Sequence, residues 1–370
     1  MQNRLWKKGL VFGIIVLFLG ASIVSGVQIH SSPQPLTRGT WLYVGGNGPG
    51  NYSKIQDAIN ASSDGDIVFV YEGLYYEYNI VIDKEVTIQG QDSESTILRC
   101  SNTTGFVINS DHVTITRFTI QYYNYGIQSD GTNYSNVSFI RIINYSGLKK
   151  GYAISFDSSH HNIVSYNTII DYYWGIKFQS NSDYNIISYN ILIDCHQYGI
   201  SIFDNSEFNH VYMNQLYMND MSQFQNYIGP ASCLYVLTNC DNNNFSYNTI
   251  DVWGEGISIS GSNNNSIYMN NVSNCIYSII LNGYNKKNTF NGRGRLPNVV
   301  KNNNFRRNIL GALSRFVTNS RDTWIGNYWS RPRVLPKIIL GVHDINIFPI
   351  RLEFDLHPAQ KPYTIPKGGV

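Results

Sequence analysis

Four aspartates have the residue type and spacing from which an enzyme could build a site. Asp130 and Asp157 occupy equivalent positions in neighbouring repeats of the chain, and so do Asp171 and Asp194. Two carboxylates stacked about 5 Å apart could act as nucleophile and acid on a sugar, or hold Ca²⁺ for a lyase. The structural interpretation is that these aspartates initiate turns, because a repeat stacks every residue type by construction.

A second candidate site is a series of aromatic residues, each directly before the small residue that begins a short apolar stretch. The series is Tyr125, Tyr152, Trp174, Tyr198 and Tyr277. Strand alternation would point these rings inward, whereas a turn at the following residue would expose them. An exposed stripe with a step of ~4.8 Å could stack sugar rings, and a buried one would be a structural ladder.

The histidines do not form a pattern typical of a metal site. His112 and His210 share a phase but lie four repeats apart, or ~19 Å at one strand spacing per repeat. The five cysteines include no C-x-x-C pair, and Gly46 and Gly48 fit neither a P-loop nor a dinucleotide loop. We therefore expect no cofactor, with Ca²⁺ at the aspartates as the one alternative.

The elements that must position these residues are defined by an internal repeat. Asparagine recurs five residues after asparagine at Asn162–Asn167, Asn185–Asn190, Asn209–Asn214, Asn243–Asn248 and Asn265–Asn270. The phase returns every 22–26 residues, except for one interval of 34 that contains an insertion around Met221–Pro230. A unit this short cannot bury its own apolar face, so the units must stack into a solenoid. Ile176 and Ile200 should then touch across adjacent coils.

Composition and charge agree with many short strands and tight turns. Charged residues are only 14% of the chain, against ~25% in a typical protein, and Gly 31 and Tyr 28 are high counts. Residues 27–285 carry 9 basic and 21 acidic side chains, a net of −12, and residues 286–370 carry 15 and 4, a net of +11. Either the basic segment docks on an acidic body, or it forms a basic surface for an anionic partner. That surface would contain Arg293, Arg295, Arg306, Arg307, Arg315, Arg331 and Arg333, beside Trp324 and Trp329.

The two ends of the chain differ from the repeats. Residues 1–26 have a basic start and an apolar run, typical of a signal peptide or an N-terminal membrane anchor. Residues 38–110 should form an N-terminal cap and the first coils, with a helix that begins at a capping box, Ser53 to Gln56, and plugs the core. Residues 111–291 are the β-helix repeats, and residues 292–370 a basic C-terminal cap with strands near Lys337–Val342 and Ile347–Phe354.

At several places the chain resembles known families. Residues 41–98 resemble pectin-lyase-like proteins through IQDAI at 55–59, GDIVFV at 65–70, Gly73-x-Tyr75-x-Glu77 and VTIQG at 86–90. Residues 111–291 resemble NosD-like repeats of the carbohydrate-binding and sugar-hydrolase (CASH) type, and TW-x-GNYW at 323–329 resembles exported archaeal proteins of this group. The resemblance implies an all-β, single-stranded right-handed parallel β-helix. The motifs of pectin methylesterases and polygalacturonases are absent, so neither family lends catalytic residues.

We expect an exported, extracellular or cell-surface protein that binds a polysaccharide or cell-surface glycan without turning it over. The alternatives are a lyase, hydrolase or epimerase that uses a stacked aspartate pair, and a purely structural module of the cell envelope. We expect a monomer, with no nucleic acid as partner. The candidate binding residues are Tyr125, Tyr152, Trp174, Tyr198, Asp130, Asp157, Asp171, Asp194, Trp324 and Trp329.

Overall fold

The computed structural model describes residues 39–99, 103–144, 151–218, 232–251, 254–282, 297–316, 322–330, 335–343 and 351–366. The targeting segment 1–26 and the insertion Met221–Pro230 lie outside the described residues, as do Arg293, Arg295, Arg331, Arg333 and the side chain of Arg315. Within the described part of the chain, no helix is long and apolar enough to cross a membrane.

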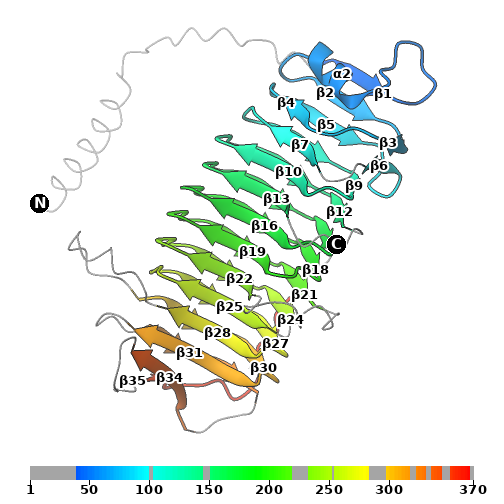
Figure 1. The fold of residues 1–370 in the computed structure, drawn as a ribbon. Helices are drawn as coiled ribbons and strands as arrows, with labels where there is room; N and C mark the ends of the chain where they lie inside the picture. Colours follow the sequence, from blue (N-terminus) through cyan, green and yellow to red (C-terminus); the bar gives the residue numbers. More distant parts are fainter. Residues whose placement is uncertain are drawn as a thin grey trace, which may run out of the picture. The chain divides into compact units, whose positions relative to one another are not determined.

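The described residues wind into a right-handed parallel β-helix with three long sheets (Figure 1). Sheet A contains β1 (Trp41–Val44), β2 (Ile67–Val70), β5 (Thr87–Gly90), β8 (Thr114–Thr116), β11 (Asn136–Ser138), β14 (Ile163–Ser165), β17 (Ile186–Ser188), β20 (His210–Tyr212), β23 (Asn244–Ser246), β26 (Ser266–Tyr268), β29 (Val299–Lys301) and β32 (Thr323–Ile325). Sheet B contains β3 (Gly73–Tyr75), β6 (Thr96–Arg99), β9 (Thr119–Gln121), β12 (Arg141–Ile143), β15 (Thr168–Ile170), β18 (Ile191–Ile193), β21 (Gln215–Tyr217), β24 (Thr249–Asp251), β27 (Asn271–Ser273), β30 (Asn304–Arg306) and β33 (Tyr328–Trp329). Sheet C contains β4 (Ile80–Ile82), β7 (Thr104–Ile108), β10 (Tyr125–Asp130), β13 (Tyr152–Asp157), β16 (Trp174–Gln179), β19 (Tyr198–Phe203), β22 (Ser232–Leu237), β25 (Glu255–Ser260), β28 (Tyr277–Asn282), β31 (Leu310–Phe316), β34 (Lys337–His343) and β35 (Arg351–Asp355).

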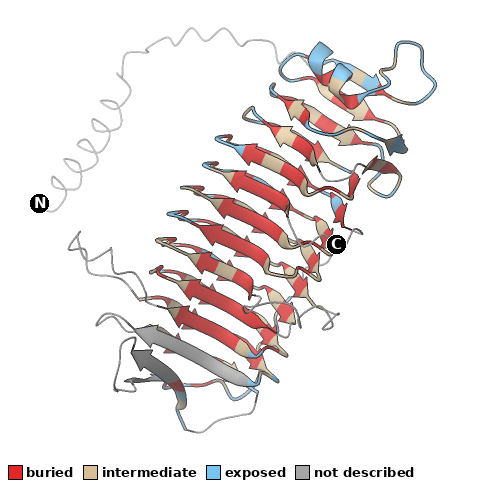
Figure 2. Ribbon diagram, viewed as in Figure 1, coloured by how far each residue is buried: buried red, intermediate tan, exposed pale blue. Residues whose placement is uncertain are grey.

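The core is a set of apolar columns inside the three sheets, with one layer of side chains from each coil (Figure 2). Ile176 pairs with Ile200 across adjacent strands of sheet C, and both side chains are buried. This confirms the predicted phase. In the sheet B strands from β9 to β30, the middle residue, such as Ile169 or Leu192, is buried in the core, because it points inward while the flanking residues point outward.

The recurrent asparagines form two buried ladders at the ends of the sheet A strands. In one, the Asn167 side chain donates to Asn190 Oδ1 and the Asn190 side chain to Asn214 Oδ1, each at 3.0 Å. Each amide also donates to a carbonyl of the preceding coil and accepts a backbone N–H, as Asn190 does from Asn167 at 3.0 Å. This ladder ends where Asn327 donates to the carboxylate of Asp355 at 3.2 Å.

The N-terminal end is closed by the helix α2 (Ile55–Ala61), whose buried residues Ile55, Ala58 and Ile59 join the core. The helix ends as expected, but its start is not the predicted capping box, because Lys54 is the N-cap residue and makes no side-chain cap. Instead, the carboxylate of Glu77 accepts the N–H groups of Ile55 and Gln56 at 2.8 and 3.1 Å. A long-range carboxylate thus satisfies the first turn.

The C-terminal region continues the solenoid well beyond residue 291, which corrects the predicted boundary. Strands β29, β30 and β31 add a coil, and β32, β33 and β34 add another, all paired in parallel with the preceding coil. The predicted terminal cap is reduced to β35, which pairs antiparallel with β34. Around the predicted insertion, β19 pairs directly with β22, so residues 219–231 add no strand between them in sheet C.

Candidate functional site

The outer surface of sheet C is shaped by an interruption in strand alternation. A Cβ placed on Gly175 would lie 2.5 Å from Leu192 Cδ2 and 3.1 Å from Cys195 Sγ, so this position faces the core. The next residue, Ile176, is also buried in the core. Because Gly175 and Ile176 both face the core, the usual alternation of inward and outward residues is interrupted, and Trp174 points outward. Simple strand parity, which placed the aromatic series inside, is therefore wrong here.

The outward rings form a continuous column, which we call the aromatic face: Tyr125, Tyr152, Trp174, Tyr198 and Tyr235. Tyr125 stacks on Tyr152 with centroids 5.7 Å apart, and Tyr198 stacks on Tyr235 at 4.4 Å. Trp174 lies between the two pairs and is turned by 89° to Tyr152 and 79° to Tyr198. Its faces therefore do not stack on those neighbours, and it is only partly buried.

Lys177 is the one cation placed on this face by the described strands β10, β13, β16, β19 and β22. Its ammonium lies 4.3 Å from the centroid of Tyr152 and 5.4 Å from that of Trp174. Burial lowers the pKa of Lys177, while Asp157 and Asp204 act in the opposite direction. The Lys177 side chain is buried, so its ammonium is already largely dehydrated and can bind a hydroxyl or carboxylate oxygen at little further desolvation cost.

Polar groups lie beside the aromatic column and at its end. Asp130 and Asp157 lie side by side on β10 and β13, as predicted, with Asp130 exposed. The Gln179 side chain donates to Asp157, which fixes that carboxylate next to the strand that carries Lys177. Ser232 and Glu255 occupy the strand position of Tyr198 in the next two coils, and Ser232 Oγ donates to Glu255 Oε2 at 2.7 Å. The predicted carboxylate pair therefore exists as neighbours on the outer surface, with one member committed to an amide.

The second aspartate pair occupies a turn, as the structural interpretation requires. Asp171 and Asp194 have φ angles of 58° and 55°, the left-handed conformation that aspartate tolerates better than most residues. Asp171 Oδ1 also lies 2.7 Å from His196 Nε2. These residues are separate from the aromatic face, and their geometry is accounted for by the turn.

The two tryptophans predicted to lie beside a basic surface belong to the core. Trp324 and Trp329 are each 4% exposed. Trp329 packs on Phe305 with centroids 4.6 Å apart, and its Nε1 donates to Asp355 at 3.0 Å. Neither side chain offers a face to a sugar, so both are removed from the candidate site.

A second aromatic column, the corner stack, runs along the turns between sheets C and A. It consists of His112, Tyr134, His161, Tyr184 and Phe208, with centroids 5.0–5.1 Å apart and interplanar angles of 1–11°. All five residues have positive φ angles. Because each ring covers the face of the next, the column presents ring edges to solvent, which suits a structural ladder better than sugar stacking.

The described residues contain no group of three or more His, Cys, Asp or Glu side chains placed to hold a metal ion. The described cysteines, Cys195, Cys233, Cys240 and Cys275, are buried thiols that form no disulfide with one another. Burial raises the pKa of the Cys240 thiol to about 12 and that of Cys233 well above its usual value. These thiols stay protonated at neutral pH, so they suit packing rather than ligation or nucleophilic chemistry.

The sequence missed three residues of the site: Phe203, Tyr235 and Glu255. Phe203 lies 5.5 Å from Trp174 and 5.7 Å from Tyr235 between ring centroids, and completes the aromatic cluster. A signal was present, since Tyr235 occupies the same strand position as Ser201 of the preceding coil and Lys177 of the one before. Reading every outward position of sheet C, rather than the residue before the glycine alone, would have found it.

The fold defines the class of protein: a right-handed parallel β-helix. Residues 141–226 match the family model described as "Periplasmic copper-binding protein (NosD)". That description names copper, but the described residues contain no cluster of three or more His, Cys, Asp or Glu side chains that could hold a metal ion. A search of the curated proteins found no match to the chain.

Solved structures share the fold at low sequence identity. The Azotobacter vinelandii mannuronan C-5 epimerase AlgE6 A-module is 11% identical, with a TM-score of 0.52, covering 79% of this chain and 91% of its own. An alginate lyase from Paenibacillus sp. str. FPU-7 is 13% identical, with a TM-score of 0.48 and coverage of 70% and 94%. A GH87 α-1,3-glucanase catalytic domain in complex with nigerose is 15% identical, with a TM-score of 0.43 and coverage of 81% and 70%.

Proposed function

We propose that this protein is an exported β-helix that binds a polysaccharide along the aromatic face of sheet C without cleaving it. The observation that carries the proposal is Trp174, a partly exposed indole turned across a column of stacked tyrosines. Apolar ring faces bordered by hydroxyl, amide and carboxylate groups match the amphipathic surface of a sugar ring.

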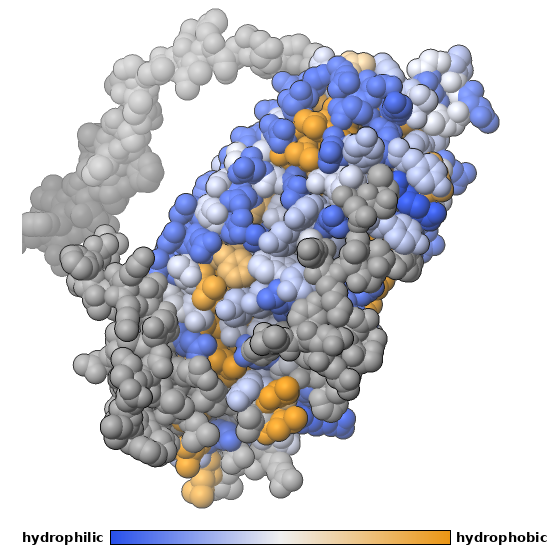
Figure 3. Space-filling view, in the orientation of Figure 1, coloured by the Kyte–Doolittle hydropathy of each residue, from blue (hydrophilic) through white to orange (hydrophobic). Residues whose placement is uncertain are grey.

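The arrangement around Trp174 also supports binding along an extended chain. Its Nε1 donates to Gln197 at 2.6 Å, which fixes the indole, and Lys177 adds a cation beside it. The coils repeat the outward position every ~4.8 Å, so a long ligand can contact several of them in turn. In the view of Figure 3, the described surface is mainly hydrophilic and its apolar residues form separate patches, as expected for a polar partner.

Export and location at the cell surface remain part of the proposal. They are supported by the basic and apolar start of the sequence. The description of the matched family model, a periplasmic protein, agrees with them.

The test is a panel of neutral and acidic polysaccharides, with and without Ca²⁺. Affinity electrophoresis in polysaccharide-containing gels measures binding, and assays for reducing ends and unsaturated products measure turnover. We expect retardation by at least one polymer, weakened in Trp174→Ala, and no new products. Products that vanish in Asp157→Asn would support the carboxylate enzyme instead. Retardation by none of the polymers would favour a structural envelope module.

A further inference from the structure

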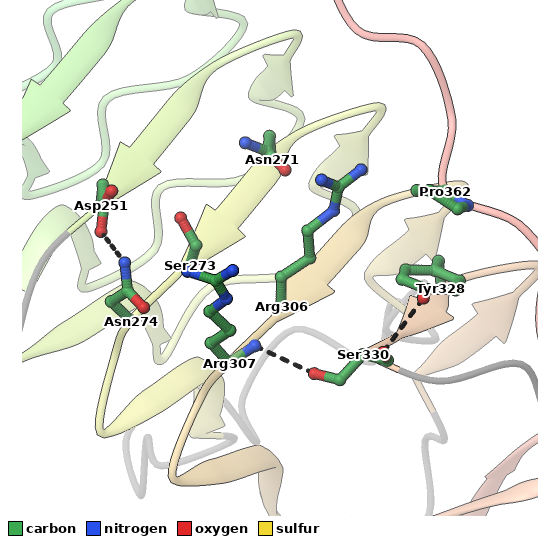
Figure 4. Close-up of a pocket in the computed structure, with 9 residues that line it drawn as sticks. All are labelled: Asp251, Asn271, Ser273, Asn274, Arg306, Arg307, Tyr328, Ser330 and Pro362. Atoms are coloured by element: carbon green, nitrogen blue, oxygen red, sulfur yellow. Dashed lines mark hydrogen bonds between the residues drawn. The ribbon is translucent and has the colours of Figure 1, made fainter.

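A polar cavity lies on the outer surface of sheet B, near the C-terminal end of the solenoid (Figure 4). It has a volume of about 420 Å³ and is lined by residues of β24, β27, β30 and β33 and by Pro362. This volume lies within the range of ~300–1,000 Å³ that is usual for small-molecule sites. Nothing in the proposed function uses this cavity.

The cavity has an excess of positive charge that no described carboxylate neutralises. Arg306 and Arg307 both line it, and neither forms an ion pair with a described carboxylate. Asp251 is the one acidic residue in the lining, and its carboxylate accepts from the Asn274 side chain at 2.6 Å. The net charge of the lining is therefore 2 − 1 = +1, and the negative charge is already engaged by an amide.

Two polar atoms of the cavity lack partners in the described structure. Arg306 Nε is buried and makes no hydrogen bond, and the same holds for Asn271 Oδ1. Figure 4 shows the Arg306 guanidinium extended toward Asn271 and Pro362, and the Arg307 side chain over Ser273. An unengaged guanidinium and an unpaired amide acceptor match a ligand that has both an oxyanion and hydroxyl donors.

Arg307 occupies a position where local structure does not favour arginine. Its φ is 51°, and the equivalent corner of the preceding coil holds Asn274 at 57°. The left-handed conformation costs a residue with a Cβ roughly 1–2 kcal/mol, and asparagine pays less than arginine.

The remaining wall is held rigidly by the C-terminal segment. The Tyr363 backbone donates to Asn304 Oδ1 at 2.8 Å, and the Asn304 side chain donates back to the Tyr363 carbonyl at 2.9 Å. Tyr363 also donates its hydroxyl to the Gly326 carbonyl at 2.7 Å. These bonds fix the segment that carries Pro362, which lines the cavity next to Tyr328 (Figure 4).

We propose that this cavity binds an acidic sugar residue through its carboxylate or sulfate group. Arg306 and Arg307 hold the oxyanion, Asn271 accepts a sugar hydroxyl, and Tyr328 contacts the ring. Arginine suits this task because its planar fork matches both carboxylate and sulfate. The site is separate from the aromatic face, so it adds a charge-selective contact to the proposed function and does not depend on it.

The test uses the full chain and three probes in calorimetric titrations: digalacturonate, a neutral disaccharide and inorganic sulfate. We expect digalacturonate to bind and the neutral disaccharide to bind at least tenfold more weakly. Added NaCl should lower the affinity for digalacturonate. Competition by sulfate would assign the site to sulfated sugars as well. Equal affinity for the neutral and acidic disaccharides, or binding of none of the probes, would overturn the proposal.

The variants separate this site from the rest of the surface. Arg306→Gln and Arg307→Gln should each weaken the binding of digalacturonate about tenfold or more, whereas Tyr184→Ala, in the corner stack, should leave it unchanged. Arg99→Gln is the matched control, since Arg99 lies on the same outer surface and donates to Gln121 at 2.9 and 2.6 Å. Arg307 is exposed, so its variant tests binding even where Arg306→Gln impairs folding. Unchanged affinity in Arg307→Gln and in the double variant would refute the assignment.

Discussion

Among the columns of stacked side chains that run along this solenoid, the asparagine ladder and the aromatic face differ most in uniformity. The asparagine ladder repeats one residue type, and each buried amide is bonded to the next coil. The aromatic face changes from coil to coil, and its central ring, Trp174, is perpendicular to its neighbours. A uniform column satisfies the needs of the fold. The aromatic face differs also from the corner stack, because Trp174 interrupts the parallel stacking of its rings, and the proposed function attributes this interruption to a ligand.

The largest effect should follow from breaking the uniform column. Asn190→Leu removes the acceptor of the Asn167 backbone N–H and the donor to the Val164 carbonyl, both buried. Each unsatisfied group costs ~1–3 kcal/mol, so we expect the free energy of unfolding to fall by about 3–5 kcal/mol. Urea denaturation measures this change in the free energy of unfolding. Asn244→Ala, at an exposed position of sheet A, is the control and should change it by less than about 0.5 kcal/mol.

The aromatic face should respond in binding rather than in folding. Trp174→Ala removes the turned indole, and we expect about 30-fold weaker polysaccharide binding, or ~2 kcal/mol, as for a central aromatic contact. Affinity electrophoresis against the polymer that retards the wild type measures this change. A large loss of thermal stability without loss of binding would show that the face is a structural ladder.

Alkaline pH should affect the aromatic face and not the asparagine ladder, because tyrosine side chains lose a proton at high pH and amide side chains do not. Burial raises the pKa of Tyr152, Tyr198 and Tyr235 above the ordinary 10.0. The folded state then keeps protons that the unfolded chain releases, so their contribution to stability is complete below pH 10.0 and is lost as the pH rises further. The urea concentration at the midpoint of unfolding should be lower at about pH 11 than at about pH 8, and this difference should be smaller in Tyr198→Phe. If the urea midpoint fell equally steeply with pH in the wild type and in Tyr198→Phe, the loss of stability would not come from this tyrosine.

The smallest effect should come from the corner stack. Tyr184 is 48% exposed and stacks on His161 and Phe208. Tyr184→Ala should lower the free energy of unfolding by about 1 kcal/mol, since each ring pair contributes ~0.5–1.5 kcal/mol. Polysaccharide binding should not change, and this variant is therefore the aromatic control for Trp174→Ala. Weaker binding in Tyr184→Ala would move the site to the corner.

The sequence predicted those features that repeat with its own period. The columns of Ile176 and Ile200 and the ladder of Asn167 and Asn190 follow from spacing alone, because a one-residue shift would expose the core. The continuation through β29 to β34 was missed, because residues 283–296 lengthen one interval and hide the phase.

The features that the sequence did not predict depend on local geometry or on distant contacts. The outward turn of Trp174 depends on the two successive inward positions at Gly175 and Ile176. The helix start depends on Glu77, over 20 residues away. The cavity around Arg306 needs the C-terminal segment held by Tyr363. None of these has a signal in the spacing of the repeat.

The end of the asparagine ladder also limits how the molecule can grow. An amide both donates and accepts, so a column of amides can in principle add another layer indefinitely, as in a fibril. Asp355 accepts from Asn327 and Trp329, and an ionised carboxylate has no hydrogen to pass on. The second ladder likewise ends with Asn298 donating to Asp322. These two carboxylates close both ladders, so neither ladder offers an amide donor to a further layer, and β35 ends sheet C in the antiparallel direction.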